Sequence, residues 1–149
     1  MSAIDDIYTD VINEHSRAQD NRRQLTAADD ELRGHNPSCG DDITLQIEYD
    51  GGKIKDLAFT GVGCAISQAS ADIMIDLLRG RELVEAQTLI EKFLSMIKRE
   101  ITDEVELAEL EDAIALKNIA NMPARVKCAV LAWRTLKDML AKRGAENVR

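Results

Sequence analysis

The chain has 149 residues, of which 45% are hydrophobic and 31% charged, a composition typical of a globular protein rather than a disordered one. Its formal charge of -8 and its aromatic content of 3% argue against nucleic acid or an anionic membrane surface as a partner. No apolar run reaches the roughly 18 residues that a membrane span needs, and the odd number of cysteines, three, indicates a reducing cytoplasm rather than a secreted disulfide framework.

The first predicted element is a helix over residues 3–15, for which Ser2 is the expected N-cap. Its apolar residues recur at helical spacing: Ile4, Ile7, Val11 and Ile12. The charged segment 16–34 shows no sustained periodicity and is interpreted as a connector. We expect a single domain over residues 1–149, in which the helix and connector, residues 1–33, are free to move.

The pattern then changes to a β-hairpin. Apolar and polar residues alternate from Ile43 to Tyr49, which predicts a strand with one buried face. The sequence "DGG" at 50–52 favours a tight turn, and "KIKDLAFTG" supplies a returning strand. This hairpin is expected to bring the "TGVGC" segment beside the "SCGD" segment.

The rest of the chain is predicted to be mainly helical. A helix over 65–79 is expected to end at Gly80, and a second covers residues 82–101. The acidic segment 102–112 leads to a short apolar piece around Ile114 and Ile119. A final helix starts at Pro123 and is expected to end before Gly144. The predicted fold class is α+β, with a small antiparallel sheet packed against several helices.

Three thiols and one carboxylate are the candidate functional groups. Cys39 lies in a polar turn, and Gly40 allows its side chain and that of Asp41 to point into one pocket. Cys64 precedes a helix, where the unpaired N–H groups favour a thiolate. Cys128 lies early in the last helix. Together these four residues would complete the tetrahedral ligand set of zinc.

Two cationic residues near Cys128, Arg125 and Lys127, are candidates for offsetting the negative charge of such a site from outside the ligand set. The spacing alone is a modest signal, because the cysteines form no C-x-x-C pair. Three independent core cysteines remain an equal alternative at this point, since free cysteine is often buried as a small hydrophobe.

The histidines and the tryptophan have simpler interpretations. The two histidines are His15 and His35. His35 is close enough in sequence to approach the cysteines, but a solvated loop histidine is the favoured reading. The lone Trp133 is expected to anchor the core rather than carry a cofactor.

The segment "HNPSCGDDITLQIEYDGGKIKDLAFTGVGCAISQASADIM" closely resembles the U-type iron–sulfur assembly proteins, the IscU and NifU N-terminal family. That family has a Cys-Gly-Asp turn, a Gly-x-Gly-Cys helix start and a third cysteine near the final helix. These motifs match Cys39, Asp41, Cys64 and Cys128, and the resemblance extends from about residue 34 to residue 140. It implies the SufE/NifU (IscU-like) fold.

Three departures from the scaffold branch resemble the SufU branch instead. Lys127 stands where IscU-type scaffolds have histidine, the chaperone-docking motif reads "NMPAR", and the segment between Cys64 and Cys128 is longer. The resemblance to SufU implies zinc held by the three cysteines and Asp41. It also implies a SufS-type cysteine desulfurase as partner, with Cys39 accepting its persulfide sulfur and passing it to a downstream scaffold or other sulfur acceptor.

Three functions therefore stand at this stage. The first is a zinc-dependent sulfurtransferase that takes sulfur from the desulfurase. The second is a scaffold that assembles and transfers a [2Fe-2S] cluster, against which Lys127 counts because a protonated ammonium cannot ligate iron. The third is a binding module whose zinc is purely structural, which chelation would unfold.

Overall fold

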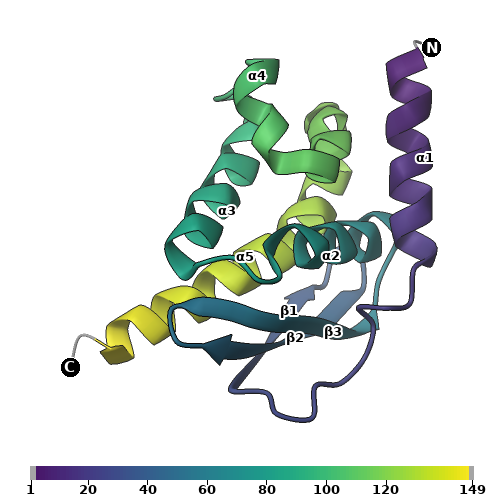
Figure 1. Ribbon diagram of the computed structural model, residues 1–149. Helices are drawn as coiled ribbons and strands as arrows, with labels where there is room; N and C mark the ends of the chain where they lie inside the picture. The colour runs from purple at the N-terminus through teal and green to yellow at the C-terminus, as the bar shows by residue number, and fades with distance from the viewer. Residues whose placement is uncertain (1–2, 148–149) are drawn as a thin grey trace.

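The computed structural model describes the backbone of residues 3–147 and the side chains of residues 8–144. Helices and strands follow in the order α1 (Ala3–Arg17), β1 (Asp30–Asn36), β2 (Asp41–Asp50), β3 (Lys53–Val62), α2 (Ala65–Leu78), α3 (Leu83–Ile97), α4 (Glu104–Leu107), the 3₁₀ helix η1 (Ala108–Asn121) and α5 (Pro123–Asn147) (Figure 1). The predicted α+β class is confirmed. None of the helices that the structure describes is long and apolar enough to cross a membrane.

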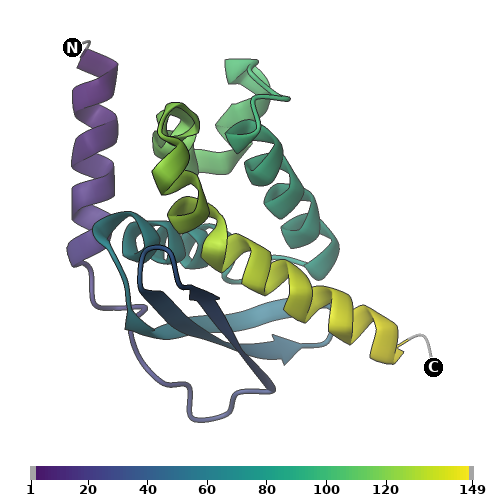
Figure 2. The ribbon, with the colours of Figure 1, turned by 180° about the vertical axis from the view of Figure 1, so that it is seen from behind.

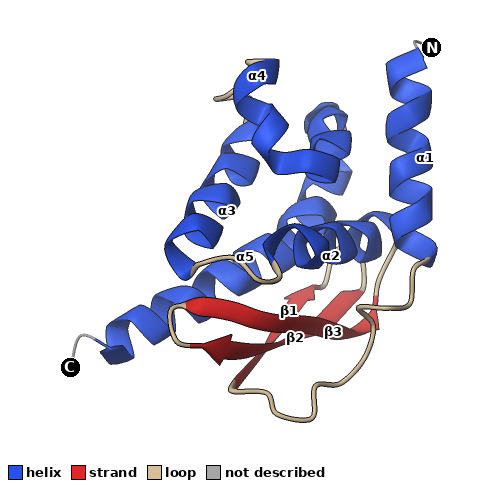
Figure 3. Cartoon of the chain, in the orientation of Figure 1, coloured by secondary structure: helices blue, strands red, loops and turns tan. Residues whose placement is uncertain are grey.

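The sheet is antiparallel throughout, with the strand order β1-β2-β3 (Figure 3). The alternating residues Ile43, Leu45 and Ile47 are buried as their periodicity predicts. Helices α2 and α5 cover this face of the sheet, and α3, α4 and η1 lie beyond them, on the side away from the sheet (Figures 1 and 2). One end of the sheet therefore faces the start of α2 and the start of α5.

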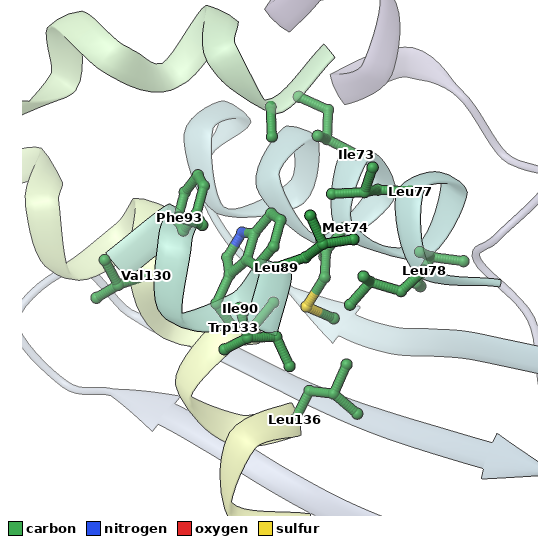
Figure 4. Close-up of a cluster of buried hydrophobic side chains, with 14 of the residues drawn as sticks. Ile73, Met74, Leu77, Leu78, Leu89, Ile90, Phe93, Val130, Trp133 and Leu136 are labelled. Atoms are coloured by element: carbon green, nitrogen blue, oxygen red, sulfur yellow. The ribbon is translucent and has the colours of Figure 1, made fainter. Parts of the chain in front are cut away.

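A hydrophobic core joins α2, α3 and α5 (Figure 4). The ring of Trp133 stacks on Phe93, with 3.9 Å between ring centroids and 8° between ring planes. Its indole N–H donates to the hydroxyl of Ser70 at 2.8 Å. Because this pairing satisfies the buried polar atom of Trp133, the residue serves as a core anchor, as predicted.

The structure differs from the predicted elements at several points. The helix predicted over residues 82–101 is α3, which ends at Ile97. Strand β1 covers residues 30–36, of which 30–34 belong to the predicted connector and the last two to the polar turn. The final helix does not end before Gly144 but continues to Asn147. The acidic segment 102–112 is partly helical, because it contains α4 and the first residues of η1. Ser2, the expected N-cap, lies outside the described residues, as do the side chains of Ile4 and Ile7.

Helix α1 packs against α2 and η1. At its last turn, His15 donates to Asp72 from Nδ1 at 2.5 Å, and its Nε2 lies 2.9 Å from a carboxylate oxygen of Asp112. The hydrogen bond to Asp72 is the main reason why the pKa of His15 is raised to about 9. The protonated imidazole therefore joins three elements by charge and hydrogen bonding.

The connector after α1 is also held in place. The N–H of Phe59 in β3 donates to the carbonyl of Asn21 at 2.9 Å, and the N–H of Arg23 donates back to Phe59 at 3.1 Å. The side-chain amide of Asn21, a buried residue, donates to Asp72 and Asp76, both at 2.8 Å. These contacts run the connector along the outer edge of β3.

Candidate metal centre

Cys39 lies in the four-residue turn between β1 and β2. Its N–H donates to the carbonyl of Asn36 at 3.3 Å, and the turn continues through Gly40 with φ at +72°. This left-handed conformation strains any residue with a Cβ atom, which explains the glycine of the Cys-Gly-Asp motif. The Cys39 thiol is half-buried, and its sulfur lies 3.8 Å from the carbonyl of Ala124 in α5.

Cys64 is the N-cap residue of α2. Its sulfur accepts a hydrogen bond from the N–H of Ser67 at 3.5 Å, in the first turn of the helix. Backbone N–H groups at a helix start attract negatively charged groups, and that of Ser67 orients the sulfur of Cys64 at the first turn of α2. Cys64 is half-buried, like Cys39, but it is fixed to a helix start rather than to a turn.

Asp41 connects the turn to the start of α2. The residue is completely buried. Its Oδ1 accepts hydrogen bonds from the N–H of Cys64 at 2.9 Å and from the hydroxyl of Ser67 at 3.1 Å. Its Oδ2 is buried and has no hydrogen-bond partner. Since a buried carboxylate oxygen without a partner is costly, Oδ2 is available for a ligand.

Cys128 completes the cluster from α5. The residue is buried, and its sulfur lies 3.0 Å from that of Cys39. These two sulfurs and a carboxylate oxygen of Asp41 all lie within 4.8 Å of one another. Burial, reinforced by the neighbouring Cys39, Asp41 and Cys64, raises the pKa of the Cys128 thiol. A cation in this cluster would oppose that effect by stabilising the thiolate.

The structure thus brings together the four residues predicted as ligands, Cys39, Asp41, Cys64 and Cys128, although the sulfur of Cys64 is not part of the 4.8 Å group. Thiolates and a carboxylate are suitable donors for zinc, and three thiolates could also hold an iron–sulfur cluster. A carboxylate oxygen of Asp41 lies within 4.8 Å of both sulfurs, and Oδ2 has no hydrogen-bond partner, which fits such a ligand. Three of the four donors of a tetrahedral set thus lie together, and the sulfur of Cys64 would have to move toward them to supply the fourth.

The two cationic residues predicted to offset the charge of the site lie at the protein surface. Arg125 and Lys127 are exposed, and neither has a hydrogen bond to the four candidate ligands among the described side chains. Lys127 instead lines a groove of about 340 Å³ together with His35 and Arg134. His35 is exposed on β1, in line with the reading of a solvated histidine.

Sequence reasoning assigned no role to three residues that shape the site. Ser67 holds Oδ1 of Asp41, and its position three residues after Cys64, in the first helical turn, is the signal that could have identified it. A methyl group on Gly63 would lie 2.3 Å from the Ser67 hydroxyl oxygen and 3.0 Å from Oδ1 of Asp41, so only glycine leaves room for this contact. Asn36 pairs with Asp41 across β1 and β2, and it belonged to the unpredicted strand.

The fold and the site define a small α+β protein that gathers thiols and a carboxylate from three separate parts of the chain. The family described as "NifU-like N terminal domain" matches residues 7–147. The chain therefore belongs to this family.

Named relatives cover nearly the whole chain. It is 40% identical to the iron-sulfur cluster assembly scaffold protein IscU of Thermotoga maritima, covering 91% of this chain and 94% of that protein. It is 34% identical to the zinc-dependent sulfurtransferase SufU of Bacillus subtilis, covering 97% and 96%.

A solved structure shows the same fold. The crystal structure of a putative iron-sulfur cluster assembly scaffold protein for the SUF system, from Fervidobacterium islandicum, superimposes with a TM-score of 0.83 at 36% identity, covering 90% of this chain and 96% of that one. The expected IscU-like fold is confirmed.

Proposed function

We propose that this protein acts in iron–sulfur cluster assembly as a zinc-binding sulfur acceptor that works with a SufS-type cysteine desulfurase. The convergence of Cys39, Asp41 and Cys128 within 4.8 Å of one another carries the proposal, together with Oδ2 of Asp41, which has no hydrogen-bond partner. The similarity to a zinc-dependent sulfurtransferase over 97% of the chain supports it. Zinc, when bound, keeps its cysteine ligands deprotonated without redox chemistry of its own.

Cys39 is the thiol best suited to accept sulfur. Cys128 is buried in α5 and Cys64 is held at the start of α2, whereas Cys39 is half-buried in a turn. The Cys39 thiolate attacks the outer sulfur of the desulfurase's cysteine persulfide. A new S–S bond forms on Cys39, the S–S bond of the desulfurase persulfide breaks, and the desulfurase cysteine leaves as a thiolate.

Asp41 and Ser67 keep the site in shape while Cys39 reacts. Oδ1 of Asp41 is tied to the N–H of Cys64 and to the hydroxyl of Ser67, so the carboxylate does not depend on Cys39 for its position. The remaining ligands would therefore stay in place when Cys39 leaves to take up sulfur.

A scaffold for a [2Fe-2S] cluster is the second candidate. It is favoured by the name of the Thermotoga maritima relative, an iron-sulfur cluster assembly scaffold protein, which is 40% identical. The same three cysteines would hold the cluster as cargo, with Asp41 as a ligand other than a thiolate. Lys127 points against this function, because it offers no imidazole in the position before Cys128.

The test combines metal analysis with desulfurase turnover. We expect one zinc per chain and a stimulation of turnover that Cys39→Ala abolishes, whereas Asp41→Ala weakens zinc binding. Ser38→Ala, an exposed neighbour in the same turn, is the matched control and is expected to stimulate like the wild type. Full stimulation by Cys39→Ala would refute the sulfur-acceptor role. Iron with labile sulfide and no stimulation would support the scaffold instead.

A further inference from the structure

Two buried polar atoms beside the cysteines lack a hydrogen-bond partner, and they are chemically complementary. One is the side-chain amide nitrogen of Asn36, a donor, and the other is Oδ2 of Asp41, an acceptor. Asn36 is 6% exposed and Asp41 0%. A buried polar group without a partner is energetically costly, so two such groups at one place indicate a function rather than chance.

The strand register places these two side chains together. Asn36, the last residue of β1, is directly opposite Asp41, the first residue of β2. Residues opposite each other in an antiparallel pair point to the same face, with Cβ atoms about 4.5–5.5 Å apart. Both residues are buried, on the face that α5 covers at β1. The backbone of Asn36 is itself anchored, because its carbonyl accepts the N–H of Cys39 at 3.3 Å.

The hydrogen bonds of Asp41 engage only one of its two carboxylate oxygens. Oδ1 already accepts two hydrogen bonds, from the N–H of Cys64 and the hydroxyl of Ser67. Oδ2 has two lone-pair positions, so it can ligate a metal ion with one and accept an N–H with the other. A ligating carboxylate that is fixed by such an outer donor holds metal more tightly, and loss of the donor typically costs 10–100-fold in affinity.

We propose that Asn36 is a positioning residue of the metal centre: its side-chain amide, which has no hydrogen-bond partner in this structure, turns to donate to Oδ2 of Asp41 when that carboxylate ligates a metal ion, and so orients the carboxylate toward the sulfurs of Cys39 and Cys128. The inference rests on the proposed metal-binding function. Asn36 then does for Oδ2 what Ser67 does for Oδ1. The carboxylate is held from both sides, which keeps it in place when Cys39 exchanges.

Asn36→Leu tests this role, because leucine has a similar branched shape and no donor. Zinc affinity is measured by competition with a chelator, and ligand geometry by the visible spectrum of the Co²⁺-substituted protein. We expect the zinc Kd to rise about 10–100-fold and the Co²⁺ bands to shift, while the unfolding free energy of the metal-free protein stays the same or increases, since a buried unpaired donor is removed. Asn36→Ala provides a second variant with the same expected result, and Ser38→Ala is the control.

Three outcomes separate the hypotheses. A zinc Kd within twofold of the wild type and an unchanged Co²⁺ spectrum in both variants would overturn the role of Asn36. A loss of stability in the metal-free protein with unchanged metal binding would also overturn this role, since Asn36 would then only stabilise the turn between β1 and β2. If Cys39→Ala and Asp41→Ala bind zinc like the wild type, the proposed metal centre itself fails.

Discussion

Substituting Gly63 by alanine tests the contact between Asp41 and the start of α2. The added methyl group would lie 2.3 Å from the hydroxyl oxygen of Ser67 and 3.0 Å from Oδ1 of Asp41. Gly63 is not among the glycines with positive φ, so alanine does not strain the backbone there. The effect of the variant therefore comes from the methyl group alone.

The size of this effect follows from the hydrogen bonds that the methyl group displaces. The hydroxyl of Ser67 bonds to Asp41 at 3.1 Å and to the carbonyl of Cys64 at 3.0 Å. A neutral hydrogen bond contributes about 1 kcal/mol and one to a charged group about 1.5–3 kcal/mol. Misplacing the carboxylate is thus expected to weaken zinc binding by about 1.5–3 kcal/mol, which is roughly a 10–100-fold rise in Kd.

The assay is competition with a chromophoric chelator at fixed pH. Gly52→Ala is the matched control, because nothing lies within 4 Å of a methyl group there. In the double variant Gly63→Ala/Ser67→Ala the clashing hydroxyl is absent. The loss of zinc-binding free energy in this variant is therefore expected to be smaller than the sum of the losses in the two single variants. Equal zinc affinity in Gly63→Ala and Gly52→Ala would refute the role of this glycine in positioning Asp41.

Three further predictions concern the rest of the molecule. Phe93→Ala removes the ring stacked on Trp133 and is expected to cost about 3–5 kcal/mol of unfolding free energy, measured in urea by the fluorescence of the lone tryptophan; a cost below 1 kcal/mol would contradict the packing. Chelation is expected to leave the circular dichroism spectrum of the protein unchanged, because the hydrophobic core cluster includes none of the four candidate ligands; unfolding would instead support purely structural zinc. His15→Gln is expected to lower the unfolding free energy by about 1–3 kcal/mol at pH 6 and less as the pH rises through 9. The pKa is raised from 6.5 to about 9, so the ion pair's contribution is complete below pH 6.5 and is lost above 9; a pH-independent difference would contradict it.

The hairpin and the meeting of its two ends were predictable from the sequence because they depend on local patterns. The strict alternation of apolar and polar residues predicts β2, and "DGG" predicts the turn. Antiparallel pairing of the two strands then places the "SCGD" and "TGVGC" segments side by side. In the structure, Asp42 pairs with Val62, which brings Asp41 to the N–H of Cys64.

Strand β1 could not be predicted in this way because it is an edge strand rich in exposed residues. Within "DELRGHN", the buried residues are Gly34 and Asn36, neither of which is hydrophobic enough to show an alternation. The burial of Gly34 depends on α5, since a Cβ atom there would lie 2.3 Å from the hydroxyl oxygen of Thr135. This requirement arises between residues about a hundred positions apart and leaves no local pattern.

The approach of Cys128 to Cys39 also depends on long-range packing. The direction of α5 is set by the contacts of Trp133 with Phe93 and Ser70, which belong to two other helices. Sequence patterns identified Cys128 as helical but gave no geometric reason for its distance to the turn. The match with the family motifs supplied that expectation, and the 3.0 Å between the two sulfurs agrees with it.

The order of the three cysteines along the chain has a consequence during protein synthesis. Cys39 and Cys64 emerge from the ribosome early, whereas Cys128 lies in the last helix. Until α5 has left the exit tunnel and packed on the sheet, a nascent chain offers metal ions only an incomplete set of donors. For the proposed metal centre, the full set of four donors therefore exists only after α5 has been synthesised and has packed, and a chain truncated before Cys128 lacks one of them.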